Sequence, residues 1–561
     1  MQLSSAPGIP AVEPSRLPRW ERVAVLTLFL LILAFKICYV RALSINSDES
    51  QHLHVAWGWT QGMVQYRDFF DNHTPLFHLA MAPLLAWLGE RADIVFRMRI
   101  AMLPLFAATL GCTYWLGARL YSKRAGIWAV LLAGTCPLLL LKSSEFRADV
   151  LWMTLWLATL AYGLTGRFTR SRAFVTGLLL GATFGVSMKT SLLLFSLLAA
   201  LGLVFWLLPK PDRKTLLAHS GGNALLAFAG LCVVPLAIAG FFATKGALPN
   251  LIYCVFKHNA LPAHGLGLHG LFHIALFALV LPLIALVGRF MLRADNQQPP
   301  LAARRALIFL TGAIFLLILR CFWPLVTSQD YLPVVPLFAL SIAPGLLRVE
   351  KIGSRLLLLA AIVQITVAAK ERSPFSKRAV RNESLVADVL RLTQSSDFVM
   401  DSKGETIFRR RPFYYVLENI TQRRMSLGLI PETIAEEMVK SRTCVTLLKR
   451  LPGKSLRWVE QYYVPVTEKL WVAGCFLPTS KKESISRRFE VAIAANYVVA
   501  SADGTVPGAM DGVAYTGPVF LNPGPHTFSS PDPRPLAVFW AQAAEKGFTP
   551  FGDLQSRDAQ P

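Results

Sequence analysis

The residues best suited to chemistry gather in a polar segment, residues 45–79, that follows the first long apolar run. Asp48 and Glu49 stand side by side near its start. A carboxylate close to a low-dielectric boundary has a raised proton affinity, which suits a general base. The same residues also have a structural interpretation, because Ser47 or Asp48 would cap a helix over residues 49–59. The two roles are compatible.

A second acidic cluster contains Glu145, Arg147 and Asp149 and lies between two short apolar runs. Taken alone, it is explained equally well by a local ion pair and a cap for a helix that begins at Val150. Capping does not account for two such clusters on one face of a membrane, which is where the topology described below places them. Together they favour a functional site on that face.

Two lysines are candidates for contact with an anion. Lys189 lies between two apolar runs with almost no loop, so its ammonium is near membrane depth, where charges are costly and tend to mark function. Alternatively, the long side chain of Lys189 extends to the membrane–water interface and has no functional role. Lys257 lies beside His258 in a later loop, where basic groups could hold a phosphate. Carboxylates and histidines lack the spacing of metal ligands, so no metal ligand is assigned and a divalent metal stays open.

The elements that must position these side chains are membrane helices. The 561 residues are 54% hydrophobic and 16% charged, which is too apolar for a soluble multidomain protein. Much of the net charge of +23 sits in short Arg and Lys clusters between apolar runs. This distribution indicates membrane topology and not nucleic-acid binding. The predicted fold class is therefore a polytopic α-helical membrane protein.

Eleven apolar runs are predicted to span the membrane. They cover about residues 23–40, 97–117, 126–141, 150–165, 174–188, 191–208, 222–243, 271–288, 306–321, 332–347 and 356–370. The basic clusters fall on alternate connectors, which places the N-terminal tail, residues 1–22, in the cytoplasm. Both acidic clusters, Lys189 and the tail after residue 370 then lie on the outer side. Lys36 within the first run favours a retained helix over a cleaved signal peptide.

The polar tail is predicted to hold two soluble regions. Residues 371–480 alternate between helical patterns, at 382–393 and 431–440, and strand patterns, at 397–401 and 443–448, and form an α/β domain. Residues 481–561 form a β-rich module. The run from Arg409 to Arg411 would contact an anionic glycan or headgroup, or would be a solvated basic strand near anionic lipid. Cys444 and Cys475 could form a disulfide in an oxidising compartment.

Four motifs in the membrane part, about residues 20–370, resemble a known family. They are Asp48-Glu49, then Tyr66-Arg67-Asp68-Phe69 with His73-Thr74-Pro75-Leu76, then Arg147-Ala148-Asp149, and Tyr331-Leu332-Pro333-Val334-Val335-Pro336. In order and sidedness the four resemble bacterial polyprenyl-phosphate-sugar-dependent transferases of the GT-C fold. These are related to protein O-mannosyltransferases and to the aminoarabinose transferases of lipid A (glycosyltransferase family 39-like). The chain departs from the family at Thr74, where Pro is common, and at Gln329-Asp330, where Arg or Lys is common, which puts donor-phosphate contacts there in doubt.

The resemblance implies an inverting membrane glycosyltransferase. It would move a sugar from a polyprenyl phosphate, such as undecaprenyl phosphate, to an acceptor on the outer face of the bacterial inner membrane. The acceptor would be lipid A of lipopolysaccharide, another envelope glycan or lipid, or a protein. Asp48 would be the general base, with Glu49 and Asp149 beside it. The resemblance also implies contacts to the donor phosphate or lipid from Arg147, Lys189, Lys257 and Tyr331, and loop support from Tyr66, Arg67, Asp68 and His73.

A transporter or flippase of lipid-linked sugars is the alternative from another class. It would need polar groups near the membrane midplane and often shows internal repeats. The ionisable groups here concentrate at one face and the sequence shows no repeat, which favours an enzyme. A sensor whose tail binds an envelope ligand would leave both acidic clusters without a role.

Overall fold

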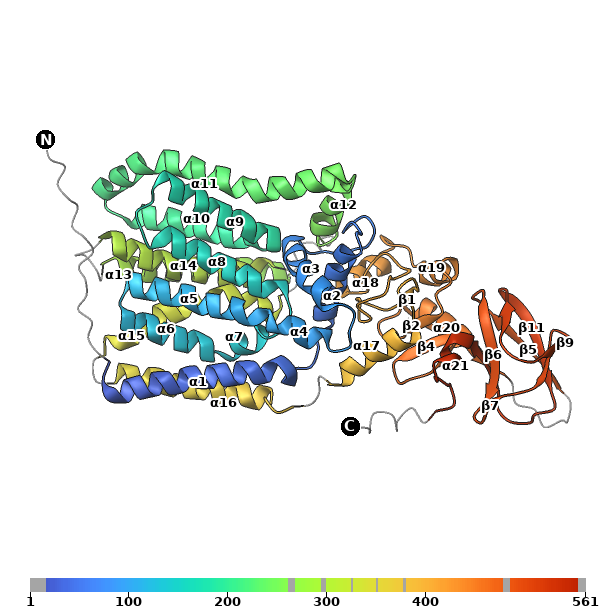
Figure 1. The fold of residues 1–561 in the computed structure, drawn as a ribbon. Coiled ribbons are helices and arrows are strands. Elements are labelled where there is room, and N and C mark those ends of the chain that lie inside the picture. Colours follow the sequence, from blue (N-terminus) through green and yellow to red (C-terminus); the bar gives the residue numbers. More distant parts are fainter. Residues whose placement is uncertain are drawn as a thin grey trace.

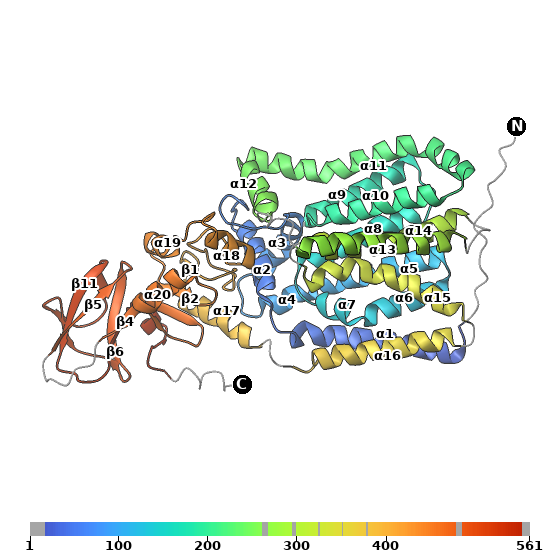
Figure 2. The ribbon, with the colours of Figure 1, turned by 180° about the vertical axis from the view of Figure 1, so that it is seen from behind.

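The computed structural model describes residues 17–260, 268–293, 299–323, 326–349, 352–376, 380–477 and 485–552. The chain forms a helical bundle and then a soluble part of mixed helices and strands. Figure 1 shows the long bundle helices running side by side, with the soluble part extending from one end of the bundle. Helix α2 (Ser47–Thr60), which carries Asp48 and Glu49, and helix α3 (Leu76–Leu88) lie at that end, against the soluble part, in both views (Figures 1 and 2).

The helices of the bundle cover the predicted spans, and several spans are made of two consecutive helical elements. They are α1 (Arg19–Ala42), α4 (Ile94–Ile100), α5 (Met102–Leu120), α6 (Lys123–Thr135), α7 (Pro137–Lys142), α8 (Ala148–Leu164), α9 (Arg170–Val186), α10 (Thr190–Leu207), α11 (Lys210–Thr244), α13 (Leu268–Arg293), α14 (Pro299–Phe322), η2 (Ser328–Val334), α15 (Val335–Leu347) and α16 (Gly353–Glu371). The run at 126–141 is divided, since Pro137 begins a new helix at its first turn, where a missing N–H costs nothing.

The bundle is a multi-pass membrane protein by helix length and composition. Within the described residues, eight helices are long and apolar enough to cross a membrane, and α3 and α8 are shorter apolar helices. The bundle core packs large side chains, among them the fully buried indoles of Trp128, Trp152 and Trp156. Two short helical elements, α12 (Leu248–Ile252) and η1 (Tyr253–Lys257), lie at the end of the bundle that carries the soluble part. The polytopic α-helical fold class predicted from the sequence is confirmed.

Helix α2 begins with a capping box, and its cap stands one or two residues before the caps expected from the sequence. The cap is Asn46, whose side chain accepts a hydrogen bond from the Asp48 N–H at 3.1 Å. Glu49 completes the box by accepting from the Asn46 N–H at 3.0 Å. The expected caps, Ser47 and Asp48, are therefore wrong, and the side chain of Asp48 is free for other contacts.

The soluble part is built on one sheet that crosses the boundary predicted at residue 480. Its strand order is β1-β2-β4-β12-β6-β10, with β3 beside β4 and β7 beside β6. The strands are β1 (Val399–Met400), β2 (Val445–Leu447), β3 (Tyr463–Pro465), β4 (Leu470–Phe476), β6 (Ala495–Ser501), β7 (Gly504–Thr505), β10 (Val519–Leu521) and β12 (Ala537–Trp540). Because β4 pairs with β12, the two regions expected to be separate share a sheet and a hydrophobic core.

A second, four-stranded sheet and five helices complete the soluble part. The sheet has the order β5-β11-β8-β9, formed by β5 (Ile485–Val491), β11 (Gly524–Ser530), β8 (Gly508–Met510) and β9 (Val513–Tyr515). The helices are α17 (Val380–Leu392), α18 (Asn419–Ser426), α19 (Ile434–Lys440), α20 (Gly453–Tyr462) and α21 (Ala541–Glu545). Cys444 and Cys475 are both free thiols, and burial raises the pKa of Cys475 to about 11.

The loop between β1 and α18 joins the soluble part to the bundle. Ile407 and Phe408 are buried in the hydrophobic core of the bundle itself. The Ile407 carbonyl pairs with Nδ1 of His54 in α2 at 2.9 Å. Arg409 donates from Nη1 to Glu90 Oε2 at 2.9 Å. This segment, residues 401–418, is called the docking loop below.

The basic run in the docking loop is not the solvated strand that the sequence suggested. Arg409 and Arg411 are almost fully buried, and Arg411 pairs with the buried Asp401 at 3.0 Å. Arg410 alone among the three is exposed. Two of the three guanidinium groups therefore hold the docking loop in place and do not face an anionic lipid or glycan.

Candidate active site

The structure brings the two acidic clusters together through Arg147. Its Nη1 donates to Asp48 Oδ2, and its Nε donates to Asp149 Oδ2 at 3.0 Å. Arg147 stands just before α8, and Asp48 is in the first turn of α2, so two separate connectors meet at the end of the bundle that carries the soluble part. Arg147 is 9% exposed and Asp48 is 29% exposed. This group of charges is called the Asp48 cluster below.

A third segment supplies a second cation. Lys403, in the docking loop, donates from Nζ to Asp48 Oδ1 and is only 7% exposed. The loop that carries it is well held, since Asp401 accepts hydrogen bonds from Gly404 N–H at 2.7 Å and from Thr406 N–H at 2.9 Å. The side chain of Asp48 thus lies between one cation from the bundle and one from the soluble part.

These two cations reverse the proton affinity expected for Asp48. Burial alone would raise the pKa of Asp48, but the charges of Arg147 and Lys403 outweigh it and hold the pKa well below its ordinary value. The expectation of a raised proton affinity is wrong, because the sequence showed neither the pairing of Arg147 with Asp48 nor the part played by Lys403. Burial would lower the pKa of Arg147, but Asp149 and Asp48 raise it further. The contacts within the cluster therefore favour the charged forms of Asp48 and Arg147.

Glu49 plays a different part from its neighbour. It is fully buried and forms a two-pronged pair with Arg99, whose Nε donates to Oε1 at 2.7 Å and whose Nη2 donates to Oε2 at 2.6 Å. The Phe146 N–H also donates to Oε1 at 2.7 Å. Glu49 therefore ties α2 to α4 and to the segment before α8, and it positions Asp48 without facing the outside.

Lys189 and Tyr331 lie on the neighbouring elements. Lys189 pairs with the buried Asp330, which also accepts a hydrogen bond from the Thr327 N–H at 2.8 Å. Asp330 is one of the positions at which the sequence departs from the family that it resembles. In this structure Asp330 is the counter-charge of Lys189. The charge of Lys189 also acts on Asp149, which connects this pair to the Asp48 cluster. Tyr331 is half-buried in the adjoining η2.

Lys257 is not joined to the cluster by any contact in the described part of the chain. Its side chain is exposed at the end of η1. Its carbonyl oxygen accepts a hydrogen bond from Arg424, so this segment anchors the soluble part.

The loop residues named from the sequence hold the segment between α2 and α3. Tyr66 is fully buried, and its hydroxyl donates to the His73 carbonyl at 2.6 Å. Asp68 accepts a hydrogen bond from the Val64 N–H at 2.7 Å and pairs with Arg67, which is about half exposed. His73 donates from Nδ1 to the buried Asp71 at 2.9 Å.

Sequence reasoning missed Lys403, Arg99 and Asp71. Lys403 is distant in the chain and belongs to an ordinary polar segment, so no local signal marks it. Arg99 lies inside an apolar run, and a charge there needs a partner, which is a signal that could have identified the Glu49 pair. Asp71 belongs to the polar loop between α2 and α3. The sequence shows an acidic residue there but gives no sign that its side chain is buried.

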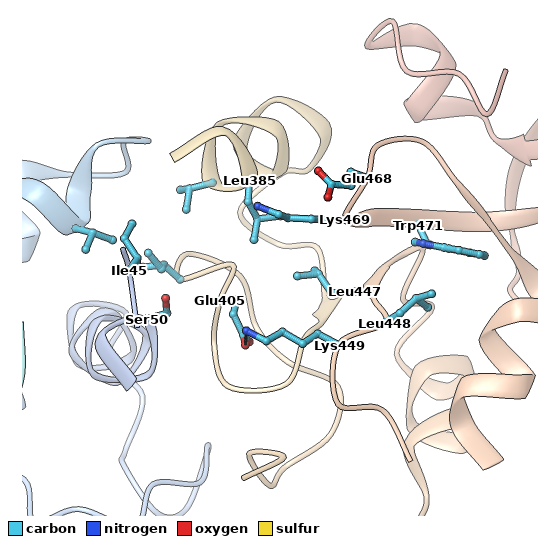
Figure 3. Close-up of a pocket in the computed structure, with 13 residues that line it drawn as sticks. Ile45, Ser50, Leu385, Glu405, Leu447, Leu448, Lys449, Glu468, Lys469 and Trp471 are labelled. Atoms are coloured by element: carbon cyan, nitrogen blue, oxygen red, sulfur yellow. Dashed lines mark ion pairs between the residues drawn. The ribbon is translucent and has the colours of Figure 1, made fainter. Parts of the chain in front are cut away.

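A cavity of about 240 Å³ lies at the junction of bundle and soluble part (Figure 3). Ile45 and Ser50 line it from the bundle, on either side of Asp48-Glu49 in the sequence. From the soluble part it is lined by Trp471, Lys449 and Glu405 among others. Asp48 and Asp149 do not line this cavity. Within the described residues, no group of three or more His, Cys, Asp or Glu is arranged to hold a metal ion.

No protein-family model and no curated protein sequence matches the chain. Among solved structures it is similar to ArnT from Cupriavidus metallidurans in the apo state, with a TM-score of 0.53 and 10% identity over 81% of this chain and 98% of that chain. ArnT bound to undecaprenyl phosphate gives a TM-score of 0.52 at 11% identity, over 82% of this chain and 98% of that chain. An Archaeoglobus fulgidus oligosaccharyltransferase gives a TM-score of 0.43 at 11% identity, over 90% and 74%. The chain therefore has the GT-C fold of ArnT, a polytopic membrane bundle followed by a soluble region.

Proposed function

We propose that the protein is a membrane glycosyltransferase that moves a sugar from a polyprenyl phosphate to an acceptor, with inversion at the anomeric carbon. The observation that carries the proposal is the Asp48 cluster, in which two carboxylates and two cations from three separate segments meet beside the membrane. ArnT, whose fold the chain shares, has been seen with undecaprenyl phosphate bound. That supports a polyprenyl phosphate as the class of donor.

The cations of the cluster suit the leaving group. A polyprenyl phosphate leaves as a stable anion, so it needs neutralisation of charge more than it needs a proton. Arg147 offers a planar guanidinium for two-point contact with phosphate oxygens, and Lys403 offers a compact charge beside it. Lys189 is a further cation near Asp149, and Tyr331 stands on the next element. A phosphate bound here would compete with Asp48 for both of its partners.

The acceptor side of the reaction falls to Asp48. Once a donor phosphate draws Arg147 and Lys403 away, the carboxylate of Asp48 is able to accept the hydrogen bond of the acceptor hydroxyl. Asp149 would hold Arg147 in place while this exchange occurs, since its bond to Nε leaves Nη1 free. Glu49 would keep the first turn of α2 in position. The acceptor classes we consider are lipid A, another envelope glycan or lipid, and protein.

The location of the cluster favours transfer over transport. A transporter of lipid-linked sugars would place its polar groups near the membrane midplane. The Asp48 cluster stands instead at the end of the bundle that carries the soluble part (Figure 1). With the basic connectors facing the cytoplasm, that end would face the periplasm of a bacterial inner membrane.

Turnover by the purified full-length protein tests this proposal. The protein would be placed in lipid vesicles with a panel of undecaprenyl-phosphate-linked hexoses and pentoses and an envelope lipid extract as acceptor. We expect release of undecaprenyl phosphate and a matching mass increase in one acceptor lipid, both measured by mass spectrometry. Mass spectra of envelope glycolipids from a deletion strain would identify the acceptor in cells. Unchanged envelope glycans and proteins, together with no turnover of any donor, would refute the proposal.

A further inference from the structure

A second group of titratable side chains lies beside the Asp48 cluster, in the loop between α2 and α3. Asp71 is fully buried and its carboxylate is surrounded by donors. Gln51 donates to Oδ1 at 3.1 Å and Gln65 donates to Oδ2 at 2.7 Å. His73 Nδ1 completes the set at 2.9 Å from Oδ1. A buried carboxylate held in this way stays ionised and accepts hydrogen bonds only.

The surrounding network determines which nitrogen of His73 carries the proton. The Trp59 indole N–H can only donate, and it donates to Gln65 Oε1 at 2.9 Å. The amide nitrogen of Gln65 must therefore face Asp71, where it acts as a donor. Since Asp71 is an acceptor, the Nδ1 of His73 carries a hydrogen. In the neutral ring, Nε2 then has a free lone pair, and no hydrogen bond within the described residues engages it.

His73 is the accessible member of the group. Its side chain is 33% exposed, whereas His52 and His78 are buried. Nδ1 of His52 lies 2.8 Å from Nε2 of His78, and Nδ1 of His78 lies 3.7 Å from Asp71 Oδ2. The ring of His73 packs against that of His52, with centroids 4.7 Å apart. The charges that act on His73 come from the loop, from α2, from α8 and from the residue before α18, namely Asp71, Asp48, Asp149 and Glu418. His73 is thus close enough to Asp48 and Asp149 for their charges to act on its ring.

The two possible proton acceptors differ in strength. Asp48 is paired with two cations and is a weak base. Burial would lower the pKa of His73, but Asp71 and Asp48 outweigh it and raise the pKa above the ordinary 6.5. A base whose pKa is close to the working pH is the most effective. His52 does not compete, because burial and its histidine neighbours lower its pKa.

We propose that His73, oriented by Asp71, is the general base that takes the proton of the attacking acceptor hydroxyl. This assignment rests on the proposed function. The acceptor oxygen forms a bond to the anomeric carbon while the bond from that carbon to the phosphate oxygen breaks. The electron pair of the broken bond leaves with the polyprenyl phosphate. The hydroxyl proton goes to Nε2 of His73, and the resulting imidazolium is stabilised by Asp71, while Asp48 orients the hydroxyl.

Chemical labelling tests the state of His73 without any donor sugar. Diethyl pyrocarbonate reacts with neutral, accessible imidazole, and mass spectrometry of the labelled full-length protein locates the site. We expect His73 to be labelled with a pH midpoint above 6.5, and the midpoint to fall in the Asp71→Asn variant. Undecaprenyl phosphate should protect His73 from labelling. An unreactive His73, or a midpoint at or below 6.5 in the wild type, would overturn the assignment.

Transfer kinetics test the role itself. In the wild type, kcat/KM should rise with pH through the titration of His73. The His73→Gln variant should lose about 100-fold in rate together with that pH dependence, and free imidazole should restore part of the activity of His73→Ala. A purely structural role would produce neither the lost pH dependence nor the rescue.

The matched control is His526→Gln. His526 also pairs with an aspartate, through Nδ1 to Asp511 at 2.7 Å, but its Nε2 is occupied by the Asn522 carbonyl at 2.8 Å, and it lies in the sheet distant from the bundle. Its rate and pH profile should match the wild type. Wild-type transfer with an unchanged profile in His73→Gln would refute the base and leave the proposed function standing. No transfer by the wild type with any donor would refute both.

Discussion

The adjacent carboxylates of Asp48 and Glu49 occupy two very different regions at the start of α2. Glu49 is sealed inside the bundle with Arg99, and both side chains are fully buried. The side chain of Asp48 is 29% exposed. It pairs with Arg147, which directly precedes α8, and with Lys403 of the docking loop. A buried pair with every lone pair satisfied is rigid and fixes geometry. A partly open carboxylate with partners from separate segments can exchange them for a ligand.

The largest effect is expected from breaking the sealed pair. Glu49→Gln leaves the buried guanidinium of Arg99 without its counter-charge, which costs about 3–5 kcal/mol of folding free energy. We expect much lower yield of folded protein and a large fall in melting temperature, measured by thermal unfolding in detergent. Glu436→Gln is the control, since it removes an exposed pair with Lys454 and should change stability by less than ~1 kcal/mol. Equal melting temperatures for the two variants would contradict the sealed-pair interpretation.

Asp48→Asn is expected to reduce turnover far more than it reduces stability. The amide keeps the shape of the side chain but removes the charge that orients the acceptor. Transfer should fall by about 10² to 10⁴, while membrane insertion stays close to that of the wild type and the melting temperature falls much less than in Glu49→Gln. Near wild-type transfer by this variant in the vesicle assay would refute the role given to Asp48.

A smaller loss of transfer is expected when the charge of Lys403 is removed. Lys403→Met keeps the length of the side chain and removes the charge that the soluble part brings to the cluster. We expect weaker binding of undecaprenyl phosphate and transfer reduced by roughly 10- to 100-fold, with partial recovery in Lys403→Arg. Exposed Lys440→Met is the control. If Lys403→Met bound undecaprenyl phosphate as the wild type does, the contribution of the docking loop to the donor site would be excluded.

The smallest expected effect is a change at low pH in the stability that the ion pairs of Asp48 contribute. The pKa of Asp48 in the folded protein is well below the ordinary 3.8. Its ion pairs therefore stabilise the fold fully at pH values above about 4, and this contribution is lost as the pH falls further towards the folded pKa. The difference in melting temperature between wild type and Asp48→Asn should be constant from pH 7 to about 4 and shrink below that. A difference that changes between pH 7 and 5 would show that another group dominates.

The sequence predicted which loops lie on the same face of the membrane, but it did not predict which charged side chains pair with one another. Hydropathy and the basic connectors placed the loops of Asp48 and Asp149 on one face. An even number of predicted spans separates the two loops, and each span is recognised from its local composition alone. The raised proton affinity expected for Asp48 was wrong for a physical reason. A pKa depends on the charges within a few ångströms, and Lys403 reaches Asp48 from a segment 355 positions later. The burial of Arg409 and Arg411 was hidden for the same reason.

The β4-β12-β6 arrangement has a consequence for the order in which the protein is made. Strand β12 fits between β4 and β6, so the sheet of the soluble part stays open until residues 537–540 have been synthesised. The helices of the bundle precede this strand in the chain, and so does the docking loop that brings Lys403 to Asp48. A chain that ends before residue 537 would lack the strand that joins β4 to β6, and its soluble part would remain two separate pieces.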